Sequence, residues 1–119
     1  MAGQHLLLDL DGAAPALLGD APAIERLLRE AAAIAGATVI HSHFHHFGPG
    51  MGVTGVLLLA ESHISIHTWP ENAFAAVDIF MCGEAQPRLA ARHIEQGLQA
   101  VGHLRVVSRN STQVSDTAA

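Results

Sequence analysis

The chain of 119 residues contains no lysine and no tyrosine, and each absence removes a class of chemistry. Without lysine, the protein cannot hold pyridoxal phosphate as an internal imine or form a lysine imine with a carbonyl substrate. Without tyrosine, acid and base chemistry falls to histidine, cysteine, aspartate or glutamate. Any catalysis by this chain is therefore confined to a few kinds of side chain.

Cysteine, basic residues and long apolar runs are also scarce. Cys82 is the only cysteine, which excludes an intramolecular disulfide and a thiolate zinc cluster and favours a cytoplasmic location. All six basic residues are arginines, spread singly through a chain of formal charge −5, so we predict no surface for nucleic acid or anionic membranes. Apolar runs such as 6–8 and 56–60 are strand-sized, and we predict no membrane span or secretion signal.

Half of the residues are apolar, and the length fits one domain with one hydrophobic core. Charged residues make up only 14%, which leaves much of the surface small or apolar. Because a partner commonly covers such a surface, we predict an oligomer.

Alternating and three-to-four-residue apolar patterns predict two helices among several strands. Asp20 is the expected N-cap of the first helix, which Gly36 ends, and Pro87 begins a second helix that Gly102 ends. A glycine-rich loop covers 47–52. The expected strands cover 5–10, 37–44, 53–60, 62–68, 75–80 and 104–108.

These elements predict an α+β fold. It is a two-layer sandwich in which an antiparallel sheet carries two helices on one face, built as two strand-helix-strand halves. We expect one domain over 1–109 and a disordered, polar tail over 110–119.

The segment 59–71 concentrates the chemistry, because it places Glu61, Ser62, His67 and Trp69 between segments with the pattern of buried strands. A serine hydroxyl held against its own preceding carbonyl can convert that amide to an ester, given strain and an oxyanion donor. Loss of the serine α-proton then expels the ester, and hydrolysis of the remaining dehydroalanine, as its imine tautomer, leaves a pyruvoyl group. Its ketone forms an imine with a substrate amine, as pyridoxal does, and its amide carbonyl accepts electrons when carbon dioxide leaves.

The residues Ala60–Glu71 and Ala75–Gly83 resemble the signature of the prokaryotic pyruvoyl-dependent S-adenosylmethionine decarboxylases, and weaker similarity extends over 36–39, 44–47 and 52–56. The resemblance implies cleavage between residues 61 and 62 into a β chain of 1–61 and an α chain. It further implies conversion of S-adenosylmethionine to the aminopropyl donor for spermidine synthesis. A homodimer of processed αβ protomers would hold the sites at its interface.

The same resemblance assigns the residues that react. Cleavage after Glu61 would convert Ser62 into the pyruvoyl cofactor, and His67 would assist this processing. Thr54 stands where the family usually has a serine and keeps the hydroxyl that helps processing. Cys82 would protonate the decarboxylated carbon of the substrate.

The resemblance also assigns residues that hold the substrate. Phe47 and Trp69 would enclose the adenine, and Glu71 would bind the ribose hydroxyls. Two departures lie near this pocket: Glu71–Phe74 reads Glu-Asn-Ala-Phe where the family commonly has Glu-Tyr-Gly-Tyr, and the loop 48–52 is one residue longer. Similar proteins with altered pockets decarboxylate basic amino acids, so arginine or ornithine is the alternative small-molecule substrate.

Two other hypotheses come from different classes of protein. Imidazoles at alternate positions of one strand point to the same face, so His41, His43 and His45, with His46, suggest a histidine-rich metal-binding module. Alternate strand residues lie almost 7 Å apart, however, which rarely closes tightly around one ion. The other hypothesis, an inactive unprocessed protein that only dimerises, is disfavoured by the intact set of Ser62, His67 and Cys82.

Overall fold

The structure is a computed structural model that describes residues 2–111. Its elements, in chain order, are β1 (Ala2–Asp11), α1 (Pro15–Leu18), α2 (Ala21–Ile34), β2 (Val39–His46), β3 (Val53–Leu59), β4 (Ser62–Trp69), the 3-10 helix η1 (Pro70–Asn72), β5 (Phe74–Cys82), α3 (Pro87–Gly97) and β6 (Val101–Asn110).

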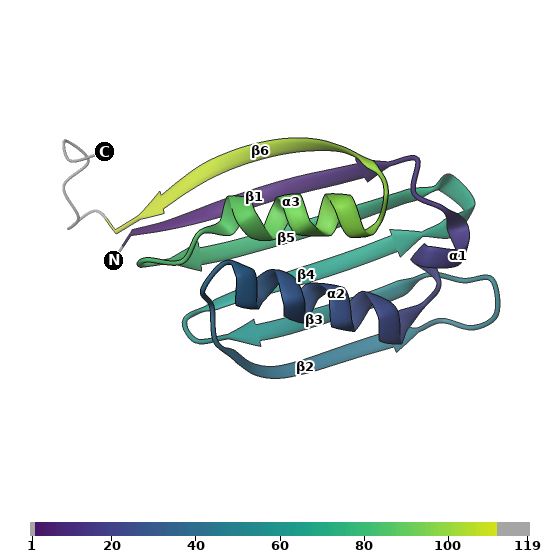
Figure 1. Cartoon of the computed structure of the whole chain (residues 1–119), viewed down its shortest axis with the longest axis horizontal. Helices are drawn as coiled ribbons and strands as arrows, with labels where there is room; N and C mark the ends of the chain where they lie inside the picture. Colours follow the sequence, from purple (N-terminus) through teal and green to yellow (C-terminus); the bar gives the residue numbers. More distant parts are fainter. Residues whose placement is uncertain (1, 112–119) are drawn as a thin grey trace.

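The six strands form one antiparallel sheet in the order β2-β3-β4-β5-β1-β6. The first strand, β1, lies between β5 and β6, so that the two ends of the chain meet in the same part of the sheet (Figure 1). The two predicted halves therefore share one continuous sheet.

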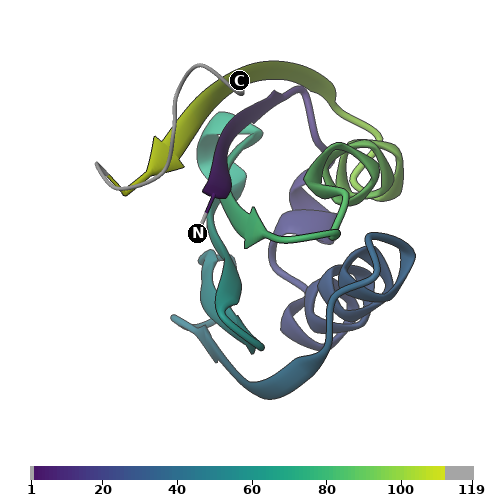
Figure 2. The same ribbon diagram turned by 90° about the vertical axis from the view of Figure 1, so that its left-hand side faces the viewer.

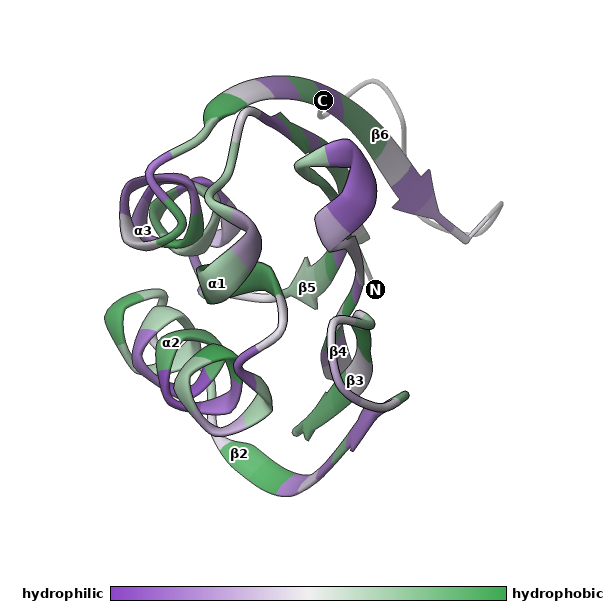
Figure 3. Ribbon diagram, turned by 90° about the vertical axis from the view of Figure 1, so that its right-hand side faces the viewer, coloured by the Kyte–Doolittle hydropathy of each residue, from purple (hydrophilic) through white to green (hydrophobic). Residues whose placement is uncertain are grey.

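Helices α2 and α3 lie on one face of this sheet, as expected, and the other face carries no helix in the part of the chain that is described (Figure 2). Alternate strand residues are buried under the helices and form the core, together with the apolar sides of α2 and α3. Figure 3 shows the apolar segments in green on the strands and on both of these helices. The largest fully buried side chains are Leu6, Leu10, Leu18, Ile24, Leu28, Val53, Leu57, Ile64, Ile66, Ile79, Met81 and Ile94. The predicted two-layer α+β sandwich is confirmed.

Asp20 is the N-cap of α2, where its carboxylate accepts a hydrogen bond from the Ala23 amide at 3.1 Å. The second predicted helix, α3, is shorter than expected. It ends at Gly97, because Gln99 has a left-handed backbone with φ of 53° and turns the chain into β6. Gly97 lies against the Leu27 side chain, where a larger residue would clash. Gly102, the predicted stop, is already inside β6.

The ends of the chain extend the sheet. Strand β6 reaches Asn110, which pairs with Ala2, so the first residue of the tail expected over 110–119 lies inside the sheet. Residues 112–119 of this tail lie outside the described residues. The single turn α1, which the sequence patterns did not predict, packs against α2 and η1. Within residues 2–111, no helix is long and apolar enough to cross a membrane.

Candidate active site

The predicted cleavage bond lies in the tight turn between β3 and β4. Leu59 pairs with Ser62 across this hairpin, which leaves only Ala60 and Glu61 as connecting residues. Glu61 has a φ of 58°, in the left-handed region that costs a residue with a side chain about 1–2 kcal/mol. The carbonyl that Ser62 would attack therefore belongs to a strained residue.

Cys82, the last residue of β5, lies beside this turn. Its Sγ donates a hydrogen bond to the Glu61 carbonyl oxygen at 3.4 Å and lies 3.9 Å from the Ser62 Oγ. One thiol thus contacts both the Glu61 carbonyl and the Ser62 hydroxyl that would attack this carbonyl. The structure brings together three of the predicted site residues, Glu61, Ser62 and Cys82, which are separated by 21 positions along the chain at most.

A second group of predicted site residues lies at the other end of β4. Thr54 and His67 are directly opposite each other in the sheet, and the Thr54 Oγ1 is hydrogen-bonded to the His67 Nδ1 at 3.1 Å. The His67 ring stacks on Trp69, with ring centroids 6.1 Å apart and an interplanar angle of 29°. This hydrogen bond and this stacking hold the imidazole plane from two sides.

The predicted substrate-binding residues surround the same end of the sheet. A cavity of about 350 Å³ is lined by Phe47, Met51, Gly52, Thr54, His67, Thr68, Trp69 and Glu71. Phe47 and Trp69 remain 55% and 39% exposed, which leaves large aromatic surfaces available to a ligand. All three predicted substrate-binding residues therefore line one cavity.

The two groups do not meet within one chain. Ser62 and His67 are five residues apart on β4, which corresponds to about 17 Å along a strand. The neighbours of Thr54 and His67 are buried under the helices, so Thr54 and His67 point to the face of the sheet without helices. We call this face, which also carries Trp69, Asp78 and Phe80, the open face.

Between the two groups, the open face carries a polar cluster that the sequence analysis did not assign. His5, Phe80 and His63 lie side by side on three strands, with the His63 and Phe80 rings stacked at 6.0 Å. The His5 Nε2 is buried without a hydrogen bond, and Asp78 Oδ1 lies 3.7 Å away. Asp78 also accepts a hydrogen bond of 3.4 Å from Ser65. In the sequence, the available signal for His5 was its odd-numbered position on β1, which places it on the strand face opposite the buried Leu6 and Leu8.

Burial changes the acidity of one member of this cluster. Desolvation lowers the pKa of His63, and the neighbouring His5 lowers it further, while Asp78 acts in the opposite direction. The neutral form of His63 is therefore favoured on the open face.

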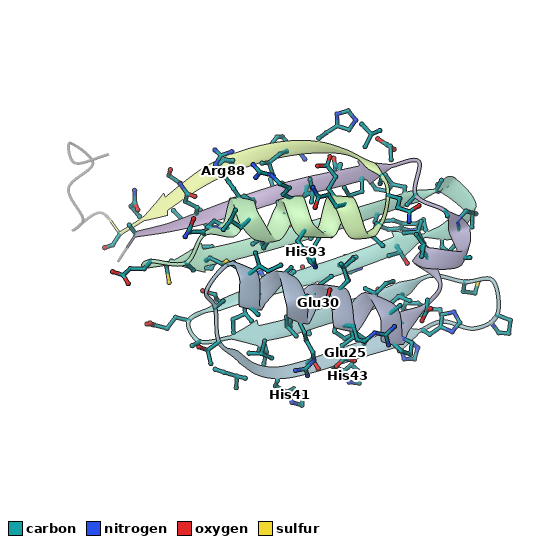
Figure 4. The ribbon with its side chains drawn as sticks, in the orientation of Figure 1. Glu25, Glu30, His41, His43, Arg88 and His93 are labelled. Atoms are coloured by element: carbon teal, nitrogen blue, oxygen red, sulfur yellow. The ribbon has the colours of Figure 1, made fainter. Side chains whose placement is uncertain are left out.

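The histidines of the metal hypothesis lie on the edge strand β2. The Ser42 hydroxyl accepts a hydrogen bond from Arg29 and donates one to Glu25 on α2, so the alternate residues His41, His43 and His45 point away from the helices. Figure 4 shows His41 and His43 along this outer edge, whereas Glu30 and His93 meet between α2 and α3 at 3.0 Å. Among residues 2–111, no three histidine, cysteine, aspartate or glutamate side chains are grouped to hold a metal ion.

The left-handed Glu61 beside the Cys82 thiol, and the hydrogen-bonded His67 in an aromatic cavity, form a candidate active site. The family of the protein is identified by comparison with known sequences. A sequence model of the family described as S-adenosylmethionine decarboxylase matches residues 4–110. The chain belongs to the S-adenosylmethionine decarboxylase family.

Individual relatives agree with this family. The S-adenosylmethionine decarboxylase proenzyme of Thermodesulfovibrio yellowstonii is 46% identical over 98 residues, 82% of this chain and 72% of that protein. The proenzyme of Parasynechococcus marenigrum is 44% identical over 120 residues, 98% of this chain and 93% of that protein. The crystal structure of the adenosylmethionine decarboxylase from Aquifex aeolicus VF5 matches with a TM-score of 0.80 and 36% identity, over 96% of this chain and 93% of that chain.

Proposed function

We propose that this enzyme decarboxylates S-adenosylmethionine with a pyruvoyl group that it makes from Ser62, and so supplies the aminopropyl donor for spermidine synthesis. The observation that carries the proposal is the Cys82 thiol, which lies 3.4 Å from the Glu61 carbonyl oxygen and 3.9 Å from the Ser62 hydroxyl. Family membership supports the reaction, and this geometry supports the bond that is cut.

The first step of processing is attack of the Ser62 Oγ on the Glu61 carbonyl carbon. Negative charge develops on the Glu61 oxygen, where the Cys82 Sγ–H already donates a hydrogen bond. The amide C–N bond then breaks, the nitrogen takes a proton, and an ester joins Glu61 to Ser62. Relief of the left-handed conformation at Glu61 favours this step.

The second step requires a base that removes the Ser62 α-proton. The ester then leaves as the Glu61 carboxylate, and a dehydroalanine remains at residue 62. Its imine tautomer takes up water and releases ammonia, which leaves the pyruvoyl group. His67 of the same chain is about 17 Å away, so we assign the base to His67 of a second copy, oriented by its Thr54 hydroxyl.

This assignment implies a homodimer that pairs through the open face. A two-fold axis that runs across the strands superimposes the Ser62 end of one sheet on the Thr54 and His67 end of the other, with the sheets about 10 Å apart. Exposed apolar side chains on this face, Leu58, Trp69 and Val107, support such a contact. Each site would then combine residues of both copies.

The residues around Ser62 fit a pyruvoyl group, because the Cys82 thiol lies directly beside residue 62 and can donate a hydrogen bond there. The group supplies a ketone that condenses with the substrate amine and a carbonyl that takes up electrons when carbon dioxide leaves. Cys82 then donates its proton to the substrate α-carbon. We expect Phe47 and Trp69 to stack on the adenine, and Glu71 to accept hydrogen bonds from the ribose hydroxyls.

Arginine or ornithine decarboxylation by the same machinery is the second candidate. The cavity favours the adenosyl substrate, because exposed aromatic rings of Phe47 and Trp69 match a flat base that neither amino acid possesses. Release of carbon dioxide from S-adenosylmethionine, arginine and ornithine should be compared side by side. Turnover of an amino acid without turnover of S-adenosylmethionine would overturn the assigned substrate.

Mass spectrometry under denaturing conditions tests self-processing directly. We expect two fragments that separate before residue 62, with the α fragment lighter than an N-terminal serine would make it. The Ser62→Ala variant should remain intact. A single species of 12.5 kDa after long incubation of the unmodified chain would contradict the proposal.

A further inference from the structure

We propose that Thr68 is a positioning residue that arranges the three substrate-binding segments and thereby acts on nucleoside binding. This inference rests on the proposed function, because it assumes that Phe47, Trp69 and Glu71 hold the substrate. Thr68 lies between His67 and Trp69 on β4, but its side chain points to the opposite face, under the helices.

Within residues 2–111, Thr68 is the one polar residue whose side chain is buried, with an exposure of 5%. Its hydroxyl oxygen accepts a hydrogen bond from the Val53 amide at 2.8 Å. The same hydroxyl donates its proton to the Leu18 carbonyl at 2.7 Å. A hydroxyl can donate its one proton and accept a hydrogen bond through its oxygen at the same time. The Thr68 side chain therefore satisfies two buried backbone groups, the Leu18 carbonyl and the Val53 amide.

The hydrogen bond to Val53 fixes the base of the loop that carries Phe47. Gly52, beside Val53, packs so closely on the Thr68 backbone that a Cβ at position 52 would overlap the Thr68 carbonyl. The Gly52 carbonyl in turn accepts a hydrogen bond from the Phe47 amide at 3.1 Å. Thr68 therefore sets the position of Phe47 through Gly52, which packs on the Thr68 backbone and is hydrogen-bonded to Phe47.

The hydrogen bond to Leu18 fixes the other side of the cavity. Leu18 is the last residue of α1, which packs against η1, and η1 contains Glu71. Trp69 follows Thr68 directly in the chain. The segments that carry Phe47, Trp69 and Glu71 thus meet at one buried hydroxyl.

Replacement of Thr68 by valine retains the shape of the side chain but removes both hydrogen bonds. We expect binding of S-adenosylmethionine to weaken about tenfold, because the aromatic walls are then no longer held in place before binding. Thr68→Ser should restore affinity, since serine keeps the same donor and acceptor. In processed enzyme, the change should appear in KM rather than in kcat.

The measurement uses the full chain with Ser62→Ala, which binds but does not process. Trp69 is the only tryptophan, so quenching of its fluorescence by S-adenosylmethionine reports binding at this cavity. The Ile94→Val variant, which loosens the core at α3, serves as the matched control and should retain affinity. If Thr68→Val prevents folding, Thr68→Cys, with a weaker donor and acceptor, should give an intermediate loss.

Three results would count against these proposals, and they have different meanings. If the Ser62→Ala chain with Thr68 intact does not bind S-adenosylmethionine, the proposed substrate is wrong. If that chain binds and the Thr68→Val and Thr68→Cys versions bind equally well, Thr68 has no positioning role and the inference is overturned. A loss in Thr68→Val that serine does not restore would also overturn it.

Discussion

Cys82 has two proposed duties at the residue scale. The same Sγ–H lies against the Glu61 carbonyl before cleavage and next to residue 62 afterwards. Processing and decarboxylation happen one after the other, and in processing the thiol donates only a hydrogen bond, so it keeps the proton that decarboxylation then requires. Cleavage after Glu61 and protonation of the substrate α-carbon would therefore both depend on the Cys82 side chain.

The two duties can be separated by substitution. Cys82→Ala removes the donor to Glu61, and we expect self-cleavage to slow about tenfold or more. Cys82→Ser keeps a hydroxyl donor and should cleave faster than the alanine variant, while decarboxylation falls in both. The fraction of intact chain over time, followed by denaturing mass spectrometry, measures cleavage. Wild-type cleavage by Cys82→Ala would refute the first duty.

His63 should make the stability of the protein depend on pH. Because burial lowers its pKa in the folded protein, the unfolded chain binds a proton more readily than the folded chain. The stability contributed by neutral His63 is present above the unfolded pKa of about 6.5. It is lost as pH falls below that value.

Urea unfolding at a series of pH values checks this sign. The free energy of unfolding should decline on the acid side, and His63→Gln should flatten part of that decline. His5 and Asp78 face His63, so the variants His5→Gln and Asp78→Asn identify their contributions. A wild-type acid decline that is unchanged in His63→Gln would assign the effect to other groups.

At the scale of elements, sequence patterns predicted every helix and strand except the short turns α1 and η1. The family resemblance named the residues of both groups, and the structure places Glu61, Ser62 and Cys82 together, whereas their chemical roles stay predictions. The end of α3 could not be predicted, since Leu98 and Val101 keep the helical spacing and the stop depends on the left-handed backbone of Gln99, a residue type that does not signal a helix end. Thr68 was missed because strict alternation shows its face but not its hydrogen-bond partners.

The turn after η1 offers a stabilising substitution. Ala73 has a φ of 51°, and it stands where the family commonly has a glycine. Ala73→Gly removes the left-handed strain and adds some entropy to the unfolded chain, so we expect a net gain of about 0.5–1 kcal/mol. Thermal unfolding should show a rise of about 4 °C or less for such a gain.

The matched control for this substitution is Ala14→Gly. Ala14 is also a connecting residue, but it is exposed and has an ordinary φ of −64°, so glycine there should lower the melting temperature. If both substitutions destabilise the protein, the left-handed strain at Ala73 is smaller than the entropy that glycine adds.

At the scale of the whole molecule, the position of β1 determines what happens after cleavage. A cut before Ser62 would leave β1, β2 and β3 in one chain and β4, β5 and β6 in the other. Strand β1 pairs with β5 on one side and β6 on the other, and β3 pairs with β4. Three strand pairings therefore join the two chains.

We expect the processed chains to migrate together. Size-exclusion chromatography without denaturant should give one peak that contains both fragments, and only denaturant should separate them. The same column tests the dimer, because a processed protomer retains the mass of the intact chain and a homodimer has twice that mass. Release of either fragment without denaturant would contradict the arrangement in which three strand pairings join the two chains.

The insertion of β1 between β5 and β6 also changes how the protein folds. Before the cut, β1 reaches its neighbours within one chain, and folding is a first-order process independent of concentration. After the cut, the same pairing requires two separate molecules to meet, so recovery from denaturation becomes second order and slows on dilution. The mature enzyme would then owe its lifetime to slow unfolding, since the single-chain folding route is lost with the Glu61–Ser62 bond.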